Sequence, residues 1–365
     1  MTSKSFVYLA AAAALSVLLA IVSFAASNHW SAGKATGDKL LPKLADSIRQ
    51  VAQIEIRQGD NSVVLEKKGD SWGVKDRGGY PVDVAKVRTL LVALGEAELI
   101  ESKTRRTDRY ATLELEDPAE KSAKSRLVRM TGAKGDAIAE VVIGKKRPEV
   151  YSTGKAGGTY VRKPGDPQSW LASVDLDASL SVKDWVKTSV LTMDTGKISR
   201  ISIEISGEQV LKVERPAAGA KDAKDDKDAK DAKEAKAPAE TPKLGFIGFP
   251  GEGKKLKDAG AAEAIARAVS SIEMEDVRKL APPPAGVSVV KIEIADGPTT
   301  TVRLRKDGDA HWLSIAATGE GEAKKAADEI TGRTKDWEFK IPASKAESIL
   351  KKRTDLLESP AAEKK

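Results

Sequence analysis

The longest apolar run of the chain lies at its start. Residues 6–26 carry no charged side chain and are rich in Ala, Leu and Val. As a helix rising about 1.5 Å per residue, the run would match the roughly 30 Å hydrocarbon core of a bilayer. The pattern predicts a single N-terminal transmembrane helix in an anchor segment, residues 1–29, with residues 6–26 in the lipid bilayer. The alternative is a signal peptide cleaved near Ala25–Ser27, whose apolar core would ordinarily span about 7–15 residues.

Alternation of apolar and polar residues begins in the next part of the chain. Residues 51–75 alternate in this way and are interrupted at Gly59 and Gly69, each followed by Asp. A period of two with such turns predicts a three-stranded antiparallel meander with one buried face. Residues 84–94 then place Val and Leu at helical spacing, and Asp83 is a suitable N-cap for that helix.

The same order of parts occurs twice more. Strand-like residues 198–213 continue, after an insertion, at 244–249 and lead to a helix near 261–272. Residues 287–315 again alternate, and a last helix is expected over 344–357. The sequence therefore predicts an α+β fold in which a single N-terminal transmembrane helix is followed by repeated antiparallel β-meander plus helix units.

Composition shifts divide the chain further. The insertion is built from Lys, Asp, Glu and Ala, and has no apolar residue larger than Ala, so we expect it to be disordered. The predicted organisation is an anchor or uncleaved signal (1–29), a juxtamembrane spacer (30–50), a first unit with extra strands (51–192), a second unit (193–280) containing the insertion (217–243), a third unit (281–358) and a tail (359–365).

Charge and residue usage exclude several classes of chemistry. The 61 basic and 54 acidic residues are interspersed, which is typical of a solvated surface, and no basic block alternates with aromatic residues. Nucleic acid is therefore not an expected partner. The chain has no Cys, which excludes disulfides, thiolate nucleophiles, iron–sulfur clusters and lipid attachment through Cys. Its two His leave little scope for a metal site, so we expect no metal and no cofactor.

One segment resembles a phosphate-binding loop. Gly248 to Lys255 has the Gly and Lys spacing of that motif and lies between a predicted strand and a predicted helix. The motif requires Ser or Thr after its Lys to ligate magnesium, but Lys255 stands there, and Pro250 removes one backbone amide. We interpret the segment as a strand-to-helix turn and expect no nucleotide partner.

Other candidate side chains have structural interpretations. Asp175 and Asp177 would face the same way on a strand-like segment and are read as a turn or helix-cap pair. His29 and His311 lack placed partners for catalysis. Aromatic residues at equivalent positions of the three units are expected to close each meander over its helix rather than to stack on a ligand. These aromatic residues are Trp72, Phe246 and Trp312. No catalytic, cofactor-binding or metal-binding residue is predicted, and the protein is not expected to be an enzyme.

Several pieces of the chain follow one another in a set order: Ile54 to Trp72, Val82–Asp83, 157–171, 182–191, 198–205 and 338–357. This order is similar to that of a bacterial envelope family of unknown function, often encoded beside gliding-motility-type ABC transporter genes. The resemblance implies an inner-membrane-anchored periplasmic accessory protein that acts with an ABC-type transport complex, and it supplies no catalytic residue. The insertion is a departure from the family pattern.

These observations lead to one expected function. The chain is predicted to be a non-catalytic accessory, scaffolding or binding protein, with ABC transporter subunits of an inner-membrane complex as its partners. A short N-terminal flank and a large hydrophilic remainder predict a single-pass bacterial inner-membrane protein whose C-terminal body lies in the periplasm. The alternative is an envelope glycan-binding module or hydrolase, which requires a concave pocket with convergent carboxylates or stacked aromatic side chains.

Overall fold

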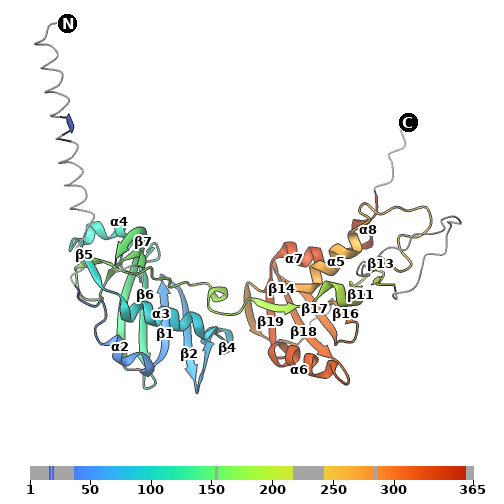
Figure 1. The fold of residues 1–365 in the computed structure, drawn as a ribbon, viewed down its shortest axis with the longest axis horizontal. Coiled ribbons are helices and arrows are strands. Elements are labelled where there is room, and N and C mark those ends of the chain that lie inside the picture. Colours follow the sequence, from blue (N-terminus) through green and yellow to red (C-terminus); the bar gives the residue numbers. More distant parts are fainter. Residues whose placement is uncertain are drawn as a thin grey trace, which may run out of the picture. The chain divides into compact units, whose positions relative to one another are not determined.

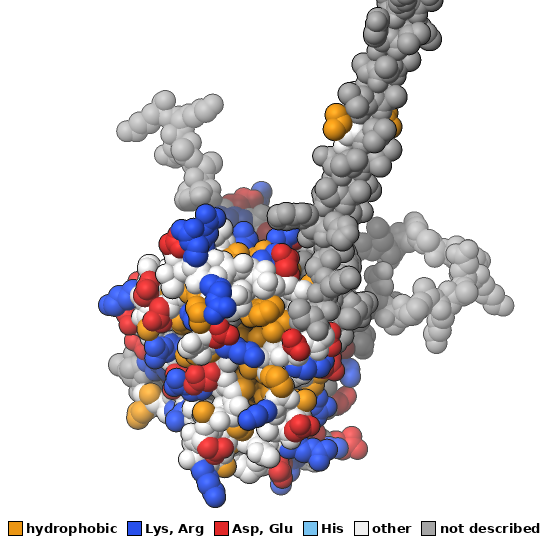
Figure 2. Space-filling model, turned by 90° about the vertical axis from the view of Figure 1, so that its left-hand side faces the viewer, with side chains coloured by type: hydrophobic (Ala, Val, Ile, Leu, Met, Phe, Trp, Pro, Cys, Tyr) orange, Lys and Arg blue, Asp and Glu red, His pale blue; other side chains and the backbone are white. Residues whose placement is uncertain are grey.

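A computed structural model describes residues 37–152, 155–216, 242–282 and 286–358, together with residues 16, 17 and 19. The chain divides into two compact units, Met1–Ser181 and Val182–Lys365. Each unit is α+β and is built on one large antiparallel sheet (Figure 1). On the face drawn in Figure 2, Lys and Arg side chains alternate with Asp and Glu rather than gathering by sign.

Unit 1 contains a nine-stranded sheet with the order β4-β3-β2-β1-β6-β7-β8-β9-β5. Its strands are β1 (Val51–Gln58), β2 (Asn61–Lys68), β3 (Ser71–Val74), β4 (Tyr80–Pro81), β5 (Leu99–Ser102), β6 (Arg126–Gly132), β7 (Ala137–Ser152), β8 (Lys155–Arg162) and β9 (Ser169–Ala172). Its helices are α2 (Leu44–Ser47), α3 (Val84–Glu96) and α4 (Tyr110–Leu113), with 3-10 turns η1 (Ile48–Gln50), η2 (Lys75–Arg77) and η3 (Thr107–Arg109).

The predicted first meander and its helix are confirmed. Strands β1, β2 and β3 pair antiparallel, and Gly59 and Gly69 occupy left-handed turn positions with φ of 56° and 60°. Such values are easily reached by glycine because it has no Cβ. Helix α3 crosses the sheet (Figure 1), and the side chain of Asp83 accepts a hydrogen bond from the Ala85 amide at 3.1 Å. Asp83 is therefore the N-cap, as predicted.

Unit 2 contains an eight-stranded sheet with the order β13-β12-β11-β16-β17-β18-β19-β15, and a two-stranded sheet of β10 and β14. Its strands are β10 (Ser189–Thr192), β11 (Ile198–Glu204), β12 (Leu211–Glu214), β13 (Gly245–Phe246), β14 (Ser271–Glu273), β15 (Asp276–Lys279), β16 (Ser288–Ile294), β17 (Thr299–Asp307), β18 (Ala310–Thr318) and β19 (Trp337–Ile341). Its helices are α5 (Ala261–Ser270), α6 (Ala323–Thr334), α7 (Ala343–Ile349) and α8 (Arg353–Leu356), with 3-10 turns η4 (Val182–Asp184) and η5 (Thr195–Lys197).

The two units repeat one strand order. In each, three strands form a meander, and a helix carries the chain to a strand at the far edge of the sheet. Four further strands then start beside the first strand and lead back to that edge strand. Strands β1, β2, β3, β5, β6, β7, β8 and β9 thus correspond to β11, β12, β13, β15, β16, β17, β18 and β19.

Registers at the centre of the two sheets also agree. Ile54 lies opposite Met130 in unit 1, and Ile201 lies opposite Ile292 in unit 2. Each of these strand pairs has a register shift next to the first residue of its leading strand. One fold therefore occurs twice in this chain.

The predicted fold class is corrected in two respects, although its α+β assignment stands. Among the residues that the structure describes, no helix is long and apolar enough to cross a membrane. The span predicted at 6–26 lies outside those residues, apart from 16, 17 and 19. In addition, the strands assigned to separate second and third units join in one sheet through the pairing of β11 with β16. An isolated meander leaves two unpaired edges, and this pairing closes one edge of each.

Segment boundaries also differ from the sequence prediction. Along the chain, the boundary between the two compact units lies between Ser181 and Val182. The later part of the predicted spacer belongs to unit 1, because Leu40 and Leu44 are fully buried there and the Leu40 amide donates to the Ala97 carbonyl at 2.8 Å. Most of the predicted insertion, residues 217–241, and the predicted tail lie outside the described residues.

Candidate functional site

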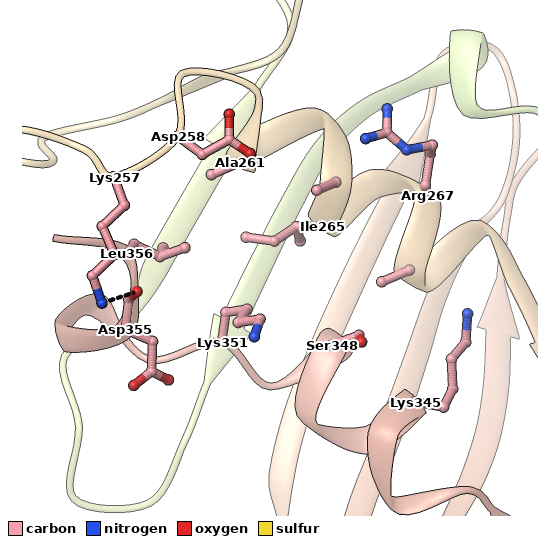
Figure 3. A pocket seen from close by; sticks show the side chains of 12 residues that line it. Lys257, Asp258, Ala261, Ile265, Arg267, Lys345, Ser348, Lys351, Asp355 and Leu356 are labelled. Carbon is pink, nitrogen blue, oxygen red and sulfur yellow. Dashed lines mark hydrogen bonds between the residues drawn. The ribbon is translucent and has the colours of Figure 1, made fainter. Parts of the chain in front are cut away.

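A groove in unit 2 runs between α5 and the C-terminal helices α7 and α8. It encloses a cavity of about 440 Å³ (Figure 3). Pockets that hold small ligands or single anchoring side chains have volumes of this order, roughly 300–1,000 Å³. The groove is formed within one compact unit, so its geometry depends only on how that unit folds.

The sequence of α5 explains the apolar floor of the groove. The helix reads AAEAIARAVS, and its small Ala side chains let α7 approach closely. Ile265 and Leu356 are 2% and 7% exposed, and Figure 3 shows both pointing into the space between the helices. The groove therefore combines a closely packed base with apolar side chains that line its interior.

Basic side chains surround this floor without partners of their own. Arg267 projects from α5, Lys345 from α7, and Lys351 from the segment that follows α7 (Figure 3). Within the described part of the chain, none of the three side chains forms a hydrogen bond or an ion pair. Arg267 is exposed, and Lys345 and Lys351 are half-buried. The groove thus carries positive charge that the surrounding protein does not neutralise.

The two carboxylates at the groove are engaged in local backbone contacts. Asp258 accepts a hydrogen bond from the Gly260 amide at 2.7 Å, just before α5. Asp355 accepts from the Lys352 amide at 3.1 Å at the start of α8. The fourth cation, Lys257, donates to the backbone carbonyl of Asp355 at 3.1 Å. These contacts tie the ends of the groove together and leave the three other cations available for a bound anion.

Lys345 is the cation most affected by its surroundings. Burial lowers the pKa of its ammonium group, and the more weakly acting charge of Glu273 only partly opposes this. Desolvation disfavours a charged amine, whereas a nearby anion favours it. A bound carboxylate or phosphate beside Lys345 would therefore relieve part of the penalty of its burial.

The sequence-predicted candidates lie elsewhere. Asp175 and Asp177 do face the same way, and a single Lys146 ammonium lies 2.9 Å and 3.6 Å from their carboxylates. They form an exposed ion pair network rather than the predicted turn or helix cap. In the Gly248–Lys255 segment, the helix that follows begins only at Ala261, so no helix N-terminus directly follows the Lys of the motif.

The aromatic residues singled out in the sequence are mostly buried. Trp72 and Trp312 are 8% and 9% exposed, and the Arg278 guanidinium lies 3.8 Å from the centre of the Trp312 ring. Phe246 is half-buried and meets Phe249 edge to face, with ring centres 5.3 Å apart. These positions offer no open stacking platform for a glycan.

The two histidines of the chain lie in different segments, and His311 is the one within the described residues. His311 lies on β18, and its Nδ1 is buried without a hydrogen-bond partner within the described ranges. His29 and the possible cleavage site at Ala25–Ser27 lie outside the described residues. No group of three or more His, Asp or Glu side chains in the described parts of the chain could hold a metal ion.

Sequence reasoning did not find the groove. Arg267 and Lys345 are far apart in a chain with 61 basic residues, and only the packing of α5 against α7 brings them to one cavity. One feature of the sequence pointed toward the groove: the Ala-rich face of α5, which indicates close packing against another helix. It does not identify α7 as that helix.

Comparison with known proteins gives one match. A sequence profile described as a domain of unknown function, DUF4340, covers residues 72–278, more than half of the chain. The chain belongs to the DUF4340 family. The DUF4340 match starts in β3 of unit 1 and ends in β15 of unit 2, so it includes parts of both copies of the fold and all of α5. No curated protein and no solved structure matches the chain. The predicted membership of a family of unknown function is confirmed.

Proposed function

We propose that this protein is a non-catalytic accessory or scaffolding protein whose α5–α7 groove binds an acidic segment of a partner protein. The observation that carries the proposal is the set of three unpaired cations, Arg267, Lys345 and Lys351, around an apolar floor. An Asp or Glu side chain of the partner would meet the cations, and a neighbouring apolar side chain would cover Ile265 and Leu356.

Physical complementarity favours a peptide of this kind. Burial of an apolar side chain supplies about 1.5–3 kcal/mol, whereas the charges orient the partner and accelerate its association. A purely apolar ligand would leave Lys345 buried and unpaired, and a purely ionic ligand would leave the floor exposed. An acidic segment with an apolar neighbour satisfies both parts of the groove.

The partner and its location extend the proposal. The resemblance to an envelope family encoded beside gliding-motility-type ABC transporters supports an ABC-type complex of the bacterial inner membrane as the partner. The two β-sheet units would then lie in the periplasm. Two copies of one fold on a single chain suit a scaffold, because each unit presents its own surface to an assembly.

The proposal is tested by crosslinking in intact cells, followed by identification of the captured protein. The full chain is compared with a variant that carries Arg267→Gln, Lys345→Gln and Lys351→Gln. A matched control carries Arg303→Gln, Lys324→Gln and Lys325→Gln, which remove the same charge from exposed positions of the same unit.

We expect the wild type and the control to capture the same transport-complex subunit. The groove variant should give a yield of crosslinked partner that is lower by about tenfold or more. The crosslink should weaken as salt rises, since exposed charges are screened over about 10 Å at 0.1 M ionic strength. Equal capture by all three proteins would refute the groove as the binding site. Selective loss of binding to anionic phospholipid vesicles, with unchanged protein capture, would replace the peptide with a lipid headgroup.

A further inference from the structure

A second cavity lies in unit 1 and is independent of the α5–α7 groove. It has a volume of about 560 Å³ and lies between one face of strands β6, β7 and β8 and a cover formed by α4 and the residues up to Glu120. Residues at alternate positions of the strands form its floor. Leu127, Val142 and Arg162 are three of these floor residues, one from each strand.

Backbone geometry holds the cover close to the sheet. A Cβ atom at Gly144 on β7 would lie 2.4 Å from the Leu113 carbonyl oxygen, so only glycine permits this approach. Helix α4 ends at Leu113, and its C-cap residue Glu114 has left-handed backbone angles with φ of 56°. Non-glycine residues rarely adopt this conformation, and such strained positions concentrate at functional sites. The bend directs the chain so that Glu116 lines the cavity.

Two oppositely charged side chains of this cavity have unused buried atoms. Nε of Arg162 and Oε2 of Glu116 are both inaccessible to solvent and lack a hydrogen-bond partner in the described parts of the chain. The Arg162 guanidinium lies 4.8 Å from the centre of the Tyr110 ring, and its Nη2 makes one long contact of 3.4 Å with the Leu115 carbonyl. Buried charged atoms without partners are unfavourable, so both favour a ligand that supplies the missing contacts.

Several neighbouring polar side chains already have partners. Arg129 is paired with Glu140, and the Tyr110 hydroxyl donates to the Pro167 carbonyl at 2.6 Å. Asp117 accepts from the Ala119 amide at 3.0 Å. Among the buried side-chain atoms of the lining residues in the described parts of the chain, Nε of Arg162 and Oε2 of Glu116 are the unmatched ones.

We propose that this cavity binds a small zwitterion, an α-amino acid or a short peptide. Its carboxylate would pair with the Arg162 guanidinium, and its ammonium group would pair with the Glu116 carboxylate, since both residues line the cavity. Charge-assisted hydrogen bonds of this kind are about twice as strong as neutral ones, which favours a zwitterion over water or an uncharged alcohol. The apolar side chain of the ligand would contact Leu127 and Val142, and the volume admits more than one residue.

Calorimetric titration of the full-length protein tests this site with four related probes. L-alanyl-L-alanine carries both charges, N-acetyl-L-alanine only the carboxylate, L-alaninamide only the ammonium group, and N-acetyl-L-alaninamide neither. We expect saturable binding of the dipeptide and at least about tenfold weaker binding when either charge is blocked. Absence of saturable dipeptide binding at millimolar concentration, or equally tight binding of the uncharged probe, overturns the proposal.

Variants then assign the two contacts. Glu116→Gln keeps the shape of the side chain and should weaken the dipeptide about tenfold while leaving N-acetyl-L-alanine unchanged. Arg162→Lys should weaken both ligands that carry a carboxylate and leave L-alaninamide unchanged. Asp70→Asn, at an exposed turn of the same unit outside the cavity, is the matched control and should change none of the affinities. Dipeptide binding that survives Glu116→Gln at full strength overturns the assignment even if the Arg162 variant fails to fold.

Discussion

The two units of this protein share a strand order but differ in the connections that cover their sheets. In unit 1 the link from β5 to β6 spans residues 103–125 and contains α4, whereas the corresponding link from β15 to β16 spans only 280–287. Unit 2 instead inserts α6 between β18 and β19 and adds α7 and α8 after β19. The polar cavity of unit 1 and the basic groove of unit 2 both lie beside these unmatched additions. A repeated scaffold has thus acquired different surfaces through its connections.

A second difference lies within the sheets themselves. On the edge strand pair β15–β19, Arg278 lies opposite Glu338. The side chain of Glu338 is only 5% exposed and also receives two hydrogen bonds from Arg305, at 2.9 Å and 2.7 Å. The corresponding pair β5–β9 of unit 1 places Ser102 opposite Trp170. The same edge therefore carries a buried charge cluster in one unit and a half-buried tryptophan opposite a serine in the other.

The largest expected effect tests whether the two units unfold independently of each other. Ile54→Ala and Ile201→Ala remove equivalent, fully buried side chains from β1 and β11. Each should lower the free energy of unfolding of its own unit by about 4 kcal/mol, because a cavity is added to the lost apolar burial. Hydrogen exchange measured by mass spectrometry should show faster exchange in the substituted unit only. Val84→Ala, on the exposed face of α3, is the control and should change little. Faster exchange throughout the chain would show that the units unfold together.

The next effect concerns the charge cluster. Glu338→Gln should lower the free energy of unfolding of unit 2 by about 3 kcal/mol at neutral pH, since it leaves two arginines without a buried anion. Burial is the largest influence on the pKa of Glu338 and raises it, but the hydrogen bonds from Arg305 and Arg278 together hold it below its ordinary value. Glu338 therefore contributes stability above the unfolded-state pKa of about 4.3 and loses it as the pH falls through the folded-state pKa.

Urea unfolding of unit 2 at a series of pH values measures this contribution. The wild type should lose stability below about pH 4.3 more steeply than Glu338→Gln. Glu214→Gln, which breaks an exposed pair with Arg200 on the same sheet, is the matched control and should have a much smaller effect. Identical acid profiles for the wild type and Glu338→Gln would contradict the assigned role of the cluster.

The two units also show which parts of the fold can be predicted from the sequence. Alternation around Ile54 and Ile201 predicts β1 and β11, because a strand with one buried face requires that period. The pairing of β11 with β16 is not predictable in this way, since the same alternation fits any antiparallel neighbour. The equivalence of the two units appears only when the strand order is known.

The two proposed binding sites could be predicted from the sequence less well than the strands. Lys345 and Arg162 are ordinary basic residues in a chain rich in them. Their importance is that the Lys345 ammonium group and the Nε of Arg162 have no hydrogen-bond partner within the described residues. Lack of a partner is a property of three-dimensional packing, because it depends on every side chain that comes within reach. The Gly and Lys pattern at Gly248–Lys255 was visible in the sequence, but it lies in a turn outside both cavities.

A smaller effect tests the cover of the unit 1 cavity, which has no counterpart in unit 2. Gly144→Ala would force the new methyl group against the Leu113 and Glu114 carbonyls and should destabilise unit 1 by about 2 kcal/mol. It should also weaken the dipeptide, because the cover that carries Glu116 must move. Gly332→Ala is the control and should stabilise unit 2 rather than destabilise it. It adds a methyl group in open space on α6 and removes a glycine from the interior of a helix. Unchanged thermal unfolding of unit 1 in Gly144→Ala would show that the cover is not held by this contact.

The smallest expected change separates binding from stability at the groove. Lys345→Met removes a half-buried cation without a partner and should stabilise unit 2 slightly, by about 0.5 kcal/mol. Because burial lowers the folded-state pKa of Lys345, the unfolded state binds more protons. Wild-type stability should therefore rise relative to the variant as the pH approaches the unfolded-state value of about 10.4. If the variant is more stable yet no longer captures the partner, Lys345 is present for binding, at the expense of the stability of unit 2. A variant that is less stable than the wild type would instead assign Lys345 a structural role and remove the main support for an anion site between α5 and α7.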